Sequence, residues 1–156
     1  GHWEADFMLF ARHGQAILVA HERTSRFTAI VRPGDRKANT TAQALADVIA
    51  PLPANLRRTI TFDNGSEFAH HHQIAAQTHI QTFFCDVRSP WQKGGVENAI
   101  GRLRRSMPRK ADIATLTDDD IQAIANRYNA TPRKCLDFRT PEEAFHDIQT
   151  SVALQT

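Results

Sequence analysis

The segment Trp3-Glu4-Ala5-Asp6-Phe7-Met8-Leu9-Phe10-Ala11 is an apolar run typical of a β-strand, with an acid in its middle. Successive side chains on a strand point to opposite faces. One face is therefore predicted to carry Trp3, Ala5, Phe7 and Leu9, and the other Glu4, Asp6, Met8 and Phe10. A carboxylate among such neighbours is costly unless it is paired or bound to a metal ion. Asp6 is thus a candidate site residue, with a salt bridge or an exposed sheet face as the alternative. Glu4 shares its face and is expected to be solvated, with a supporting contact beside the candidate site as the alternative.

The segments that follow predict an α/β fold. Two strands are expected at Ala16–Ala20 and Phe27–Val31, and their tight turns predict an antiparallel meander with the first strand. Later strands are expected at Arg58–Phe62 and Ile80–Phe84. The expected helices are Asn39–Ala50 with Thr40 or Thr41 as its cap, Glu67–Gln77, Gln92–Met107, one from the Thr117 cap to Tyr128, and one from Thr140 to Phe145. This order predicts a mixed sheet with helices on both faces.

Length and composition limit the class of protein. The 156 residues are enough for one domain with a core, so residues 1–156 are expected to form a single domain. No apolar run approaches the roughly 20 residues that span a bilayer, and no signal peptide is recognisable. Cys85 and Cys135 match no metal or redox spacing and are expected to be reduced thiols in the cytoplasm. The chain begins at Gly1, so a fragment of a longer protein is expected.

A second acid, Asp63, follows the apolar run Ile60-Thr61-Phe62 and lies where a strand is expected to end. The carboxyl ends of such strands are where α/β proteins usually carry their sites. An ordinary Asp-Asn-Gly turn is the alternative.

A third acid, Glu97, lies on a basic helix. It is the single acid between Arg88 and Lys110, a segment that holds seven Lys and Arg residues, although the net charge of the chain is only +2. A concentrated basic stripe is typical of a protein that binds a phosphate backbone. A weak surface ion pair of Glu97 with Lys93 or Arg104 is the alternative.

Other catalytic classes have little support in the sequence. There is no glycine-rich phosphate loop, which argues against nucleotide hydrolysis. Ser25 and Ser66 have no recognisable base partner for nucleophilic chemistry. Three consecutive histidines, His70–His72, are expected on a helix surface, where neighbouring side chains diverge and cannot chelate one ion well.

Taken together, these segments resemble the catalytic core of retroviral integrases and DDE transposases, and most of all insertion-sequence transposases of the "IS thirty" type. The segments that carry the resemblance are Gly1–Asp6, Thr24–Arg26, Phe62–Phe68, Ser89–Gly94, Glu97-Asn98, Tyr128-Asn129, Pro132–Lys134 and Thr140–Phe145. Thirty-three residues separate Asp63 from Glu97, near the interval usual in the family. Ala5 departs from the glycine expected at its position.

The resemblance implies a ribonuclease H-like fold, with a five-stranded mixed sheet and flanking helices. It also implies that Asp6, Asp63 and Glu97 bind two Mg²⁺ or Mn²⁺ ions that promote cleavage of transposon ends and strand transfer into target DNA. Lys93, Arg104, Arg102, Arg105, Gln92 and Asn98 are the candidate DNA contacts, although a solvated helix face remains the alternative for Arg102 and Arg105.

The partners implied are transposon-end and target DNA and further copies of the chain in the active complex, with no membrane. A nucleoid-associated bacterial protein in the cytoplasm is expected. Two alternatives remain open: another ribonuclease H-like nuclease such as a resolvase, and a domesticated domain that binds DNA or protein without catalysis.

Overall fold

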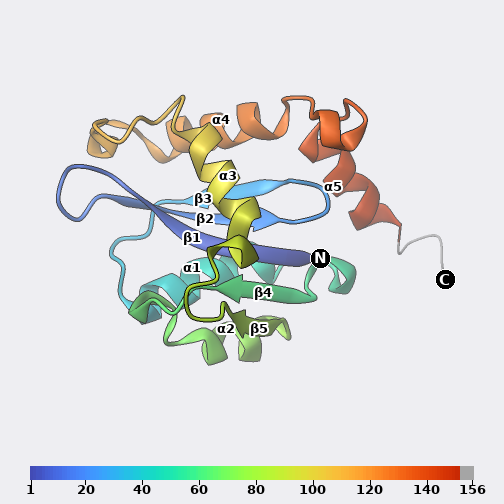
Figure 1. The fold of residues 1–156 in the computed structure, drawn as a ribbon, viewed down its shortest axis with the longest axis horizontal. Helices are drawn as coiled ribbons and strands as arrows, with labels where there is room; N and C mark the ends of the chain where they lie inside the picture. The colour runs from blue at the N-terminus through green and yellow to red at the C-terminus, as the bar shows by residue number, and fades with distance from the viewer. Residues whose placement is uncertain (152–156) are drawn as a thin grey trace.

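A single five-stranded sheet forms the centre of the molecule (Figure 1). The computed structural model describes residues 1–151, with Pro90 described only as part of its helical turn. The strands are β1 (His2–Leu9), β2 (Ala16–Glu22), β3 (Thr28–Val31), β4 (Thr59–Phe62) and β5 (Gln81–Phe84). The α-helices are α1 (Ala38–Ile49), α2 (His71–Thr78), α3 (Gly94–Leu103), α4 (Asp118–Asn129) and α5 (Pro141–Thr150).

The strand order is β3-β2-β1-β4-β5. β1, β2 and β3 pair in antiparallel fashion, whereas β4 pairs in parallel with both β1 and β5. The predicted meander and the predicted mixed, ribonuclease H-like sheet are therefore confirmed. The long crossover through α1 explains how β4 can lie parallel to β1, because parallel neighbours need a connection of this kind.

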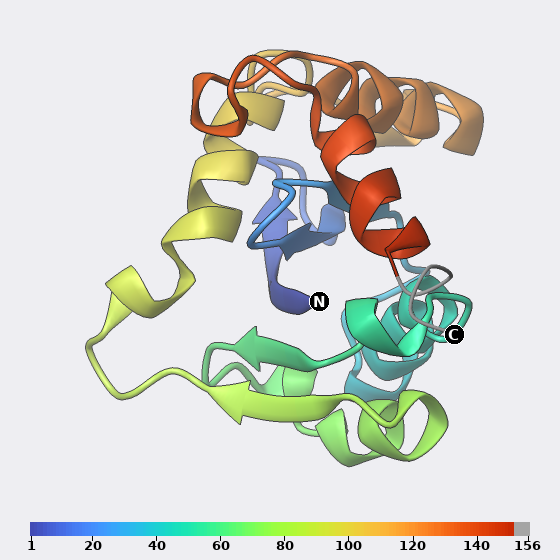
Figure 2. The ribbon, with the colours of Figure 1, turned by 90° about the vertical axis from the view of Figure 1, so that its right-hand side faces the viewer.

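Helices cover both faces of the sheet, as the sequence predicted (Figure 2). On one face, Trp3, Ala5 and Phe7 of β1 pack with side chains from α1, α2 and α5. On the other, Met8 and Phe10 pack with side chains from α3 and α4. The period-two alternation of β1 thus holds except at Leu9, which is exposed.

The first three helices differ from the expectation in where they begin. α1 begins at Ala38 after Lys37, and Thr41 is buried within the helix instead of capping it. The expected helix Glu67–Gln77 is divided into a 3-10 turn, Ser66–Phe68, and α2, because the Phe68 ring stacks on Phe62 in the core at a centroid distance of 4.7 Å. A 3-10 turn at Pro90–Lys93 precedes α3, which is shorter than Gln92–Met107.

The last two helices begin where the sequence predicted. Thr117 and Asp120 form a capping box at α4, and Thr140 and Glu143 form one at α5. In each box the hydroxyl and the carboxylate satisfy backbone N–H groups that have no partner within the helix. α5 continues to Thr150 rather than ending at Phe145.

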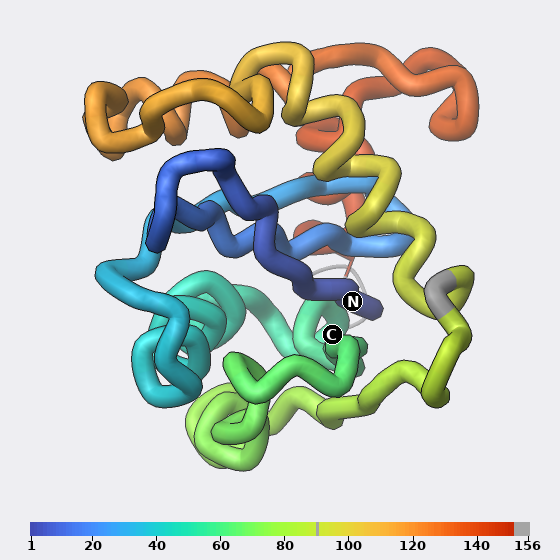
Figure 3. Tube along the Cα trace, turned by 60° about the vertical axis from the view of Figure 1, so that its left-hand side comes forward, coloured from blue at the N-terminus to red at the C-terminus, as the bar shows by residue number. Residues whose placement is uncertain are grey.

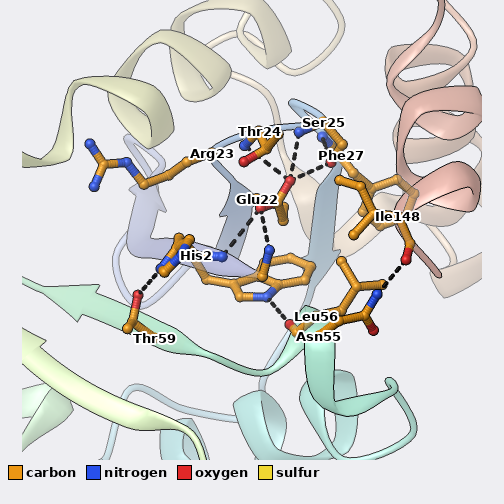
Figure 4. Close-up of polar contacts among 12 residues, drawn as sticks. His2, Glu22, Arg23, Thr24, Ser25, Phe27, Asn55, Leu56, Thr59 and Ile148 are labelled. Atoms are coloured by element: carbon orange, nitrogen blue, oxygen red, sulfur yellow. Dashed lines mark hydrogen bonds and ion pairs between the residues drawn. The ribbon is translucent and has the colours of Figure 1, made fainter. Parts of the chain in front are cut away.

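The end of β2 is held by Glu22, a fully buried carboxylate (Figure 4). Its Oε2 accepts hydrogen bonds from the backbone of Thr24 and from both the backbone and the hydroxyl of Ser25, at 2.6–3.0 Å. Burial alone would raise the pKa of Glu22, but hydrogen bonds from the amino-terminal ammonium and from Ser25 lower it. The hydrogen bonds of Glu22 with Thr24 and Ser25 therefore fix the turn between β2 and β3.

Both cysteines are free thiols, with Cys85 buried and Cys135 exposed. Across residues 1–151, none of the helices has the length and apolar character needed to cross a membrane.

We expect the stability of the fold to depend on His21, a buried residue of β2 whose Nδ1 lies 2.9 Å from the Thr28 hydroxyl. Burial, reinforced by the charge of Arg26, lowers the pKa of His21 to about 4. An unfolded chain takes up this proton near pH 6.5, so between pH 6.5 and 4 the unfolded state binds more protons. The free energy of unfolding should therefore fall by about 3 kcal/mol as the pH drops through this window.

Urea titrations at a series of pH values measure this loss. A His21→Asn variant keeps a group able to bond Thr28 but cannot titrate, so its stability should vary less across the window. An equal pH dependence in the variant and the unmodified chain would contradict the assignment to His21.

Candidate functional site

Asp6 and Asp63 lie next to each other because β1 and β4 pair in parallel. Glu4 is the register partner of Thr61, and two further residues along each strand lead to Asp6 and Asp63. Asp63 directly follows β4, at its carboxyl end. Its Oδ1 accepts a hydrogen bond of 2.9 Å from the backbone of Gly65, which closes the turn and orients the carboxylate. The two acids that the sequence singled out on strands are therefore brought together.

A lysine joins the two carboxylates. The Nζ atom of Lys93 lies 2.8 Å from Oδ2 of Asp6 and 2.9 Å from Oδ2 of Asp63. Lys93 is only 4% exposed, whereas both carboxylates remain partly exposed. Burial alone would lower the pKa of Lys93, but its hydrogen bonds to Asp6 and Asp63 outweigh that effect and raise it. The ammonium thus offsets the repulsion between two neighbouring negative charges.

The third predicted acid is not part of this cluster. Glu97 lies in the first turn of α3 and is exposed. Neither alternative ion pair forms, because Lys93 pairs with the two aspartates and Arg104 donates to the backbone oxygen of Leu9. Within the described part of the chain, no three His, Cys, Asp or Glu side chains are arranged to share one metal ion. The roles of Asp6, Asp63 and Glu97 as metal ligands remain predictions.

The sequence analysis missed the structural role of Glu4. It is 2% exposed rather than solvated, and its carboxylate accepts the backbone N–H of Val96 at 2.8 Å and pairs with Arg23 at 3.1 Å. A side chain on Gly95 would come within 2.9 Å of both Glu4 and His21. Gly95 therefore lets the start of α3 approach the sheet closely, because it has no side chain.

Figure 3 shows the path of the chain from β5 into α3, and Gln92, one of the candidate DNA contacts, lies in the 3-10 turn on this path. Gln92 closes the loop after β5 through two hydrogen bonds with Asp86, at 2.7 and 2.9 Å. The neighbouring Trp91 is 74% exposed, so its side chain contributes little to the core.

The other candidates lie along α3 or just beyond it. Asn98 accepts a hydrogen bond of 3.1 Å from Arg102, and Arg102 and Arg105 are exposed. Arg104 is only partly exposed, and its guanidinium lies 5.1 Å from the centre of the Phe10 ring. Lys93 can reach a phosphate only by exchanging its present partners. Contact of any of these residues with DNA remains a prediction.

The three consecutive histidines make separate contacts. His70 lies against Asn39, and Nδ1 of His71 lies 2.8 Å from the Thr82 hydroxyl. His70 and His71 are half-buried and His72 is exposed.

Comparison with known proteins identifies the family. A model of the integrase core domain matches residues 1–90. Transposase InsI for insertion sequence element IS30A of Escherichia coli is 38% identical over 99% of this chain, and the transposase for insertion sequence element IS1086 of Cupriavidus metallidurans is 37% identical over 95% of it. The transposase for insertion sequence element IS4351 of Bacteroides fragilis is 35% identical over 98%. The chain spans only 39–47% of the length of these three relatives. It belongs to the integrase core domain family.

Proposed function

We propose that this chain is the catalytic domain of a DNA transposase, which cleaves transposon ends and transfers strands into target DNA with the help of divalent cations. One observation carries the proposal: two aspartates on adjacent strands converge on a single positive charge, at 2.8 and 2.9 Å. The names of the three relatives support the transposase activity.

The residues present fit a hard divalent cation. Such ions prefer carboxylate oxygens, and Asp6 and Asp63 direct one oxygen each toward a common point. Bound Mg²⁺ or Mn²⁺ would activate a water or a DNA 3′-hydroxyl for attack on a phosphodiester and stabilise the leaving oxygen. Glu97 is the proposed third carboxylate, and its place in the first turn of α3 leaves it exposed and free of competing ion pairs among the described residues.

In this proposal Lys93 has two alternative positions. It neutralises the aspartates while no metal is bound, and it must leave them when a divalent cation binds between them. Its long side chain can then direct the ammonium toward a phosphate oxygen, which reconciles its present burial with the predicted DNA contact.

Strand joining distinguishes this function from that of a resolvase, which cuts DNA without transferring a strand.

Removing any of the three acids should abolish catalysis. We expect Asp6→Asn, Asp63→Asn and Glu97→Gln each to reduce Mn²⁺-dependent nicking of supercoiled plasmid DNA by at least about a hundredfold, because each loses a charge that the reaction needs. Asp119→Asn is the matched control, since Asp119 is an exposed acid in the first turn of α4. Thermal melting of each variant checks its folding. Full nicking activity in a folded Asp6→Asn variant would refute the proposal.

Replacement of Lys93 tests the competition between ammonium and metal without relying on activity. Lys93→Met should bind Mn²⁺ more tightly than the unmodified chain in titration calorimetry, because no internal cation then has to be displaced. Without metal it should lose about 2 kcal/mol of stability, since two charge-assisted hydrogen bonds disappear. Lys110→Met removes an exposed lysine and serves as the control. Unchanged Mn²⁺ affinity in Lys93→Met would argue against displacement.

A further inference from the structure

A second polar feature adjoins the start of α3, next to the residue that joins the carboxylate pair. It is a cavity of about 880 Å³ between β2, α3 and the segment that follows α4. Four basic side chains line it: Arg26, Arg102, Arg133 and Lys134. No Asp or Glu is among the described residues that line it. Two of the segments that carried the family resemblance, Thr24–Arg26 and Pro132–Lys134, meet at this cavity although the carboxylate site uses neither.

The positive charge of the cavity is not neutralised within the described structure. None of the four basic side chains forms an ion pair with a described acid, although seven other Lys and Arg residues do. The positive charges around the cavity also repel one another. Burial and then the nearby charges of Arg102 and Arg105 lower the pKa of Arg133. Several cations without counter-charges around one hollow create a potential that attracts an anion.

The side chain of Arg133 is held in place, and the backbone that bears Arg26 is part of a fixed turn. The guanidinium of Arg133 lies over the Tyr128 ring at 4.4 Å and donates a hydrogen bond of 2.9 Å to the backbone oxygen of Tyr128. Its Nε is buried and has no hydrogen-bond partner among the described residues. Arg26, with a left-handed φ of 63°, lies on the turn that Glu22 fixes through Ser25. A site with fixed donors binds its ligand at a lower entropic cost than flexible side chains do.

The cavity also adjoins the carboxylate pair. Gly94 and Gly95 line it, and the residue before them, Lys93, binds Asp6 and Asp63. The volume of the cavity lies in the range of sites that hold ligands larger than a single phosphate group. A polyanion that extends from the carboxylates past the start of α3 would therefore meet these four cations.

We propose that this cavity binds the phosphodiester backbone of DNA at a position separate from the phosphate that reacts. Arg26, Arg102, Arg133 and Lys134 donate to non-bridging phosphate oxygens, for which guanidinium groups have a suitable planar geometry. The choice of DNA over another polyphosphate rests on the proposed function.

Salt-dependent binding tests the cavity. Lys134→Gln and Arg26→Gln should each weaken binding of a fluorescein-labelled 20-base-pair duplex. Each should also reduce the slope of log affinity against log salt by about 0.9, the value for one lost phosphate contact. Arg58→Gln is the matched control, because Arg58 is exposed and lies before β4, away from the carboxyl end that bears Asp63. Lys134 is exposed, so its variant keeps the test valid if Arg26→Gln fails to fold.

Cys135 supplies an independent readout, since it is exposed and lines the cavity, whereas Cys85 is buried. The duplex should slow alkylation of Cys135 by iodoacetamide in the unmodified chain and protect it less in Lys134→Gln. Protection by adenosine triphosphate but not by the duplex would overturn the proposal in favour of a mononucleotide site.

The outcomes separate this proposal from the proposed function. Unchanged salt slopes and an unprotected Cys135 would overturn the cavity site even if plasmid nicking depends on the three acids. Altered slopes and a protected Cys135, in a chain that nicks no DNA, would support the cavity site and count against the catalytic proposal alone.

Discussion

The contact of one lysine with two aspartates is the interaction on which the site depends. Parallel pairing of β1 with β4 forces Asp6 and Asp63 to be neighbours, and like charges at such short range repel each other strongly unless a cation lies between them. Lys93 provides that cation at 2.8 and 2.9 Å. The same geometry that stabilises the chain without metal is suited to a divalent ion, since either cation satisfies the same pair of oxygens.

The position of Lys93 depends in turn on how closely α3 approaches the sheet. The Glu4 carboxylate accepts the backbone N–H of Val96, and Gly95 leaves room for that contact because it has no side chain. Glu4 is buried and partly neutralised by Arg23. The start of α3 is therefore anchored on the same strand that carries Asp6, and its two glycines line the basic cavity.

Local patterns in the sequence were sufficient to predict much of the fold. The alternation of β1, the apolar run of β2 and the capping residues Thr117 and Thr140 depend on neighbours close in sequence, and the structure confirms all of them. The family resemblance added the expectation that Asp6 and Asp63 belong to one site. Contacts between distant segments were not predictable in this way. Lys93 lies 87 residues from Asp6, and its long side chain could equally have pointed to solvent. The burial of Glu4 and the meeting of Arg26 with Arg133 likewise depend on packing that no local pattern encodes.

Anomalous diffraction from crystals of the chain soaked in Mn²⁺ would locate the bound ion. We predict a manganese peak between the Asp6 and Asp63 carboxylates, with the Lys93 ammonium moved out of that position and the Glu97 carboxylate turned toward the ion. Manganese bound only at other positions, with Lys93 still joining the two aspartates, would contradict the account.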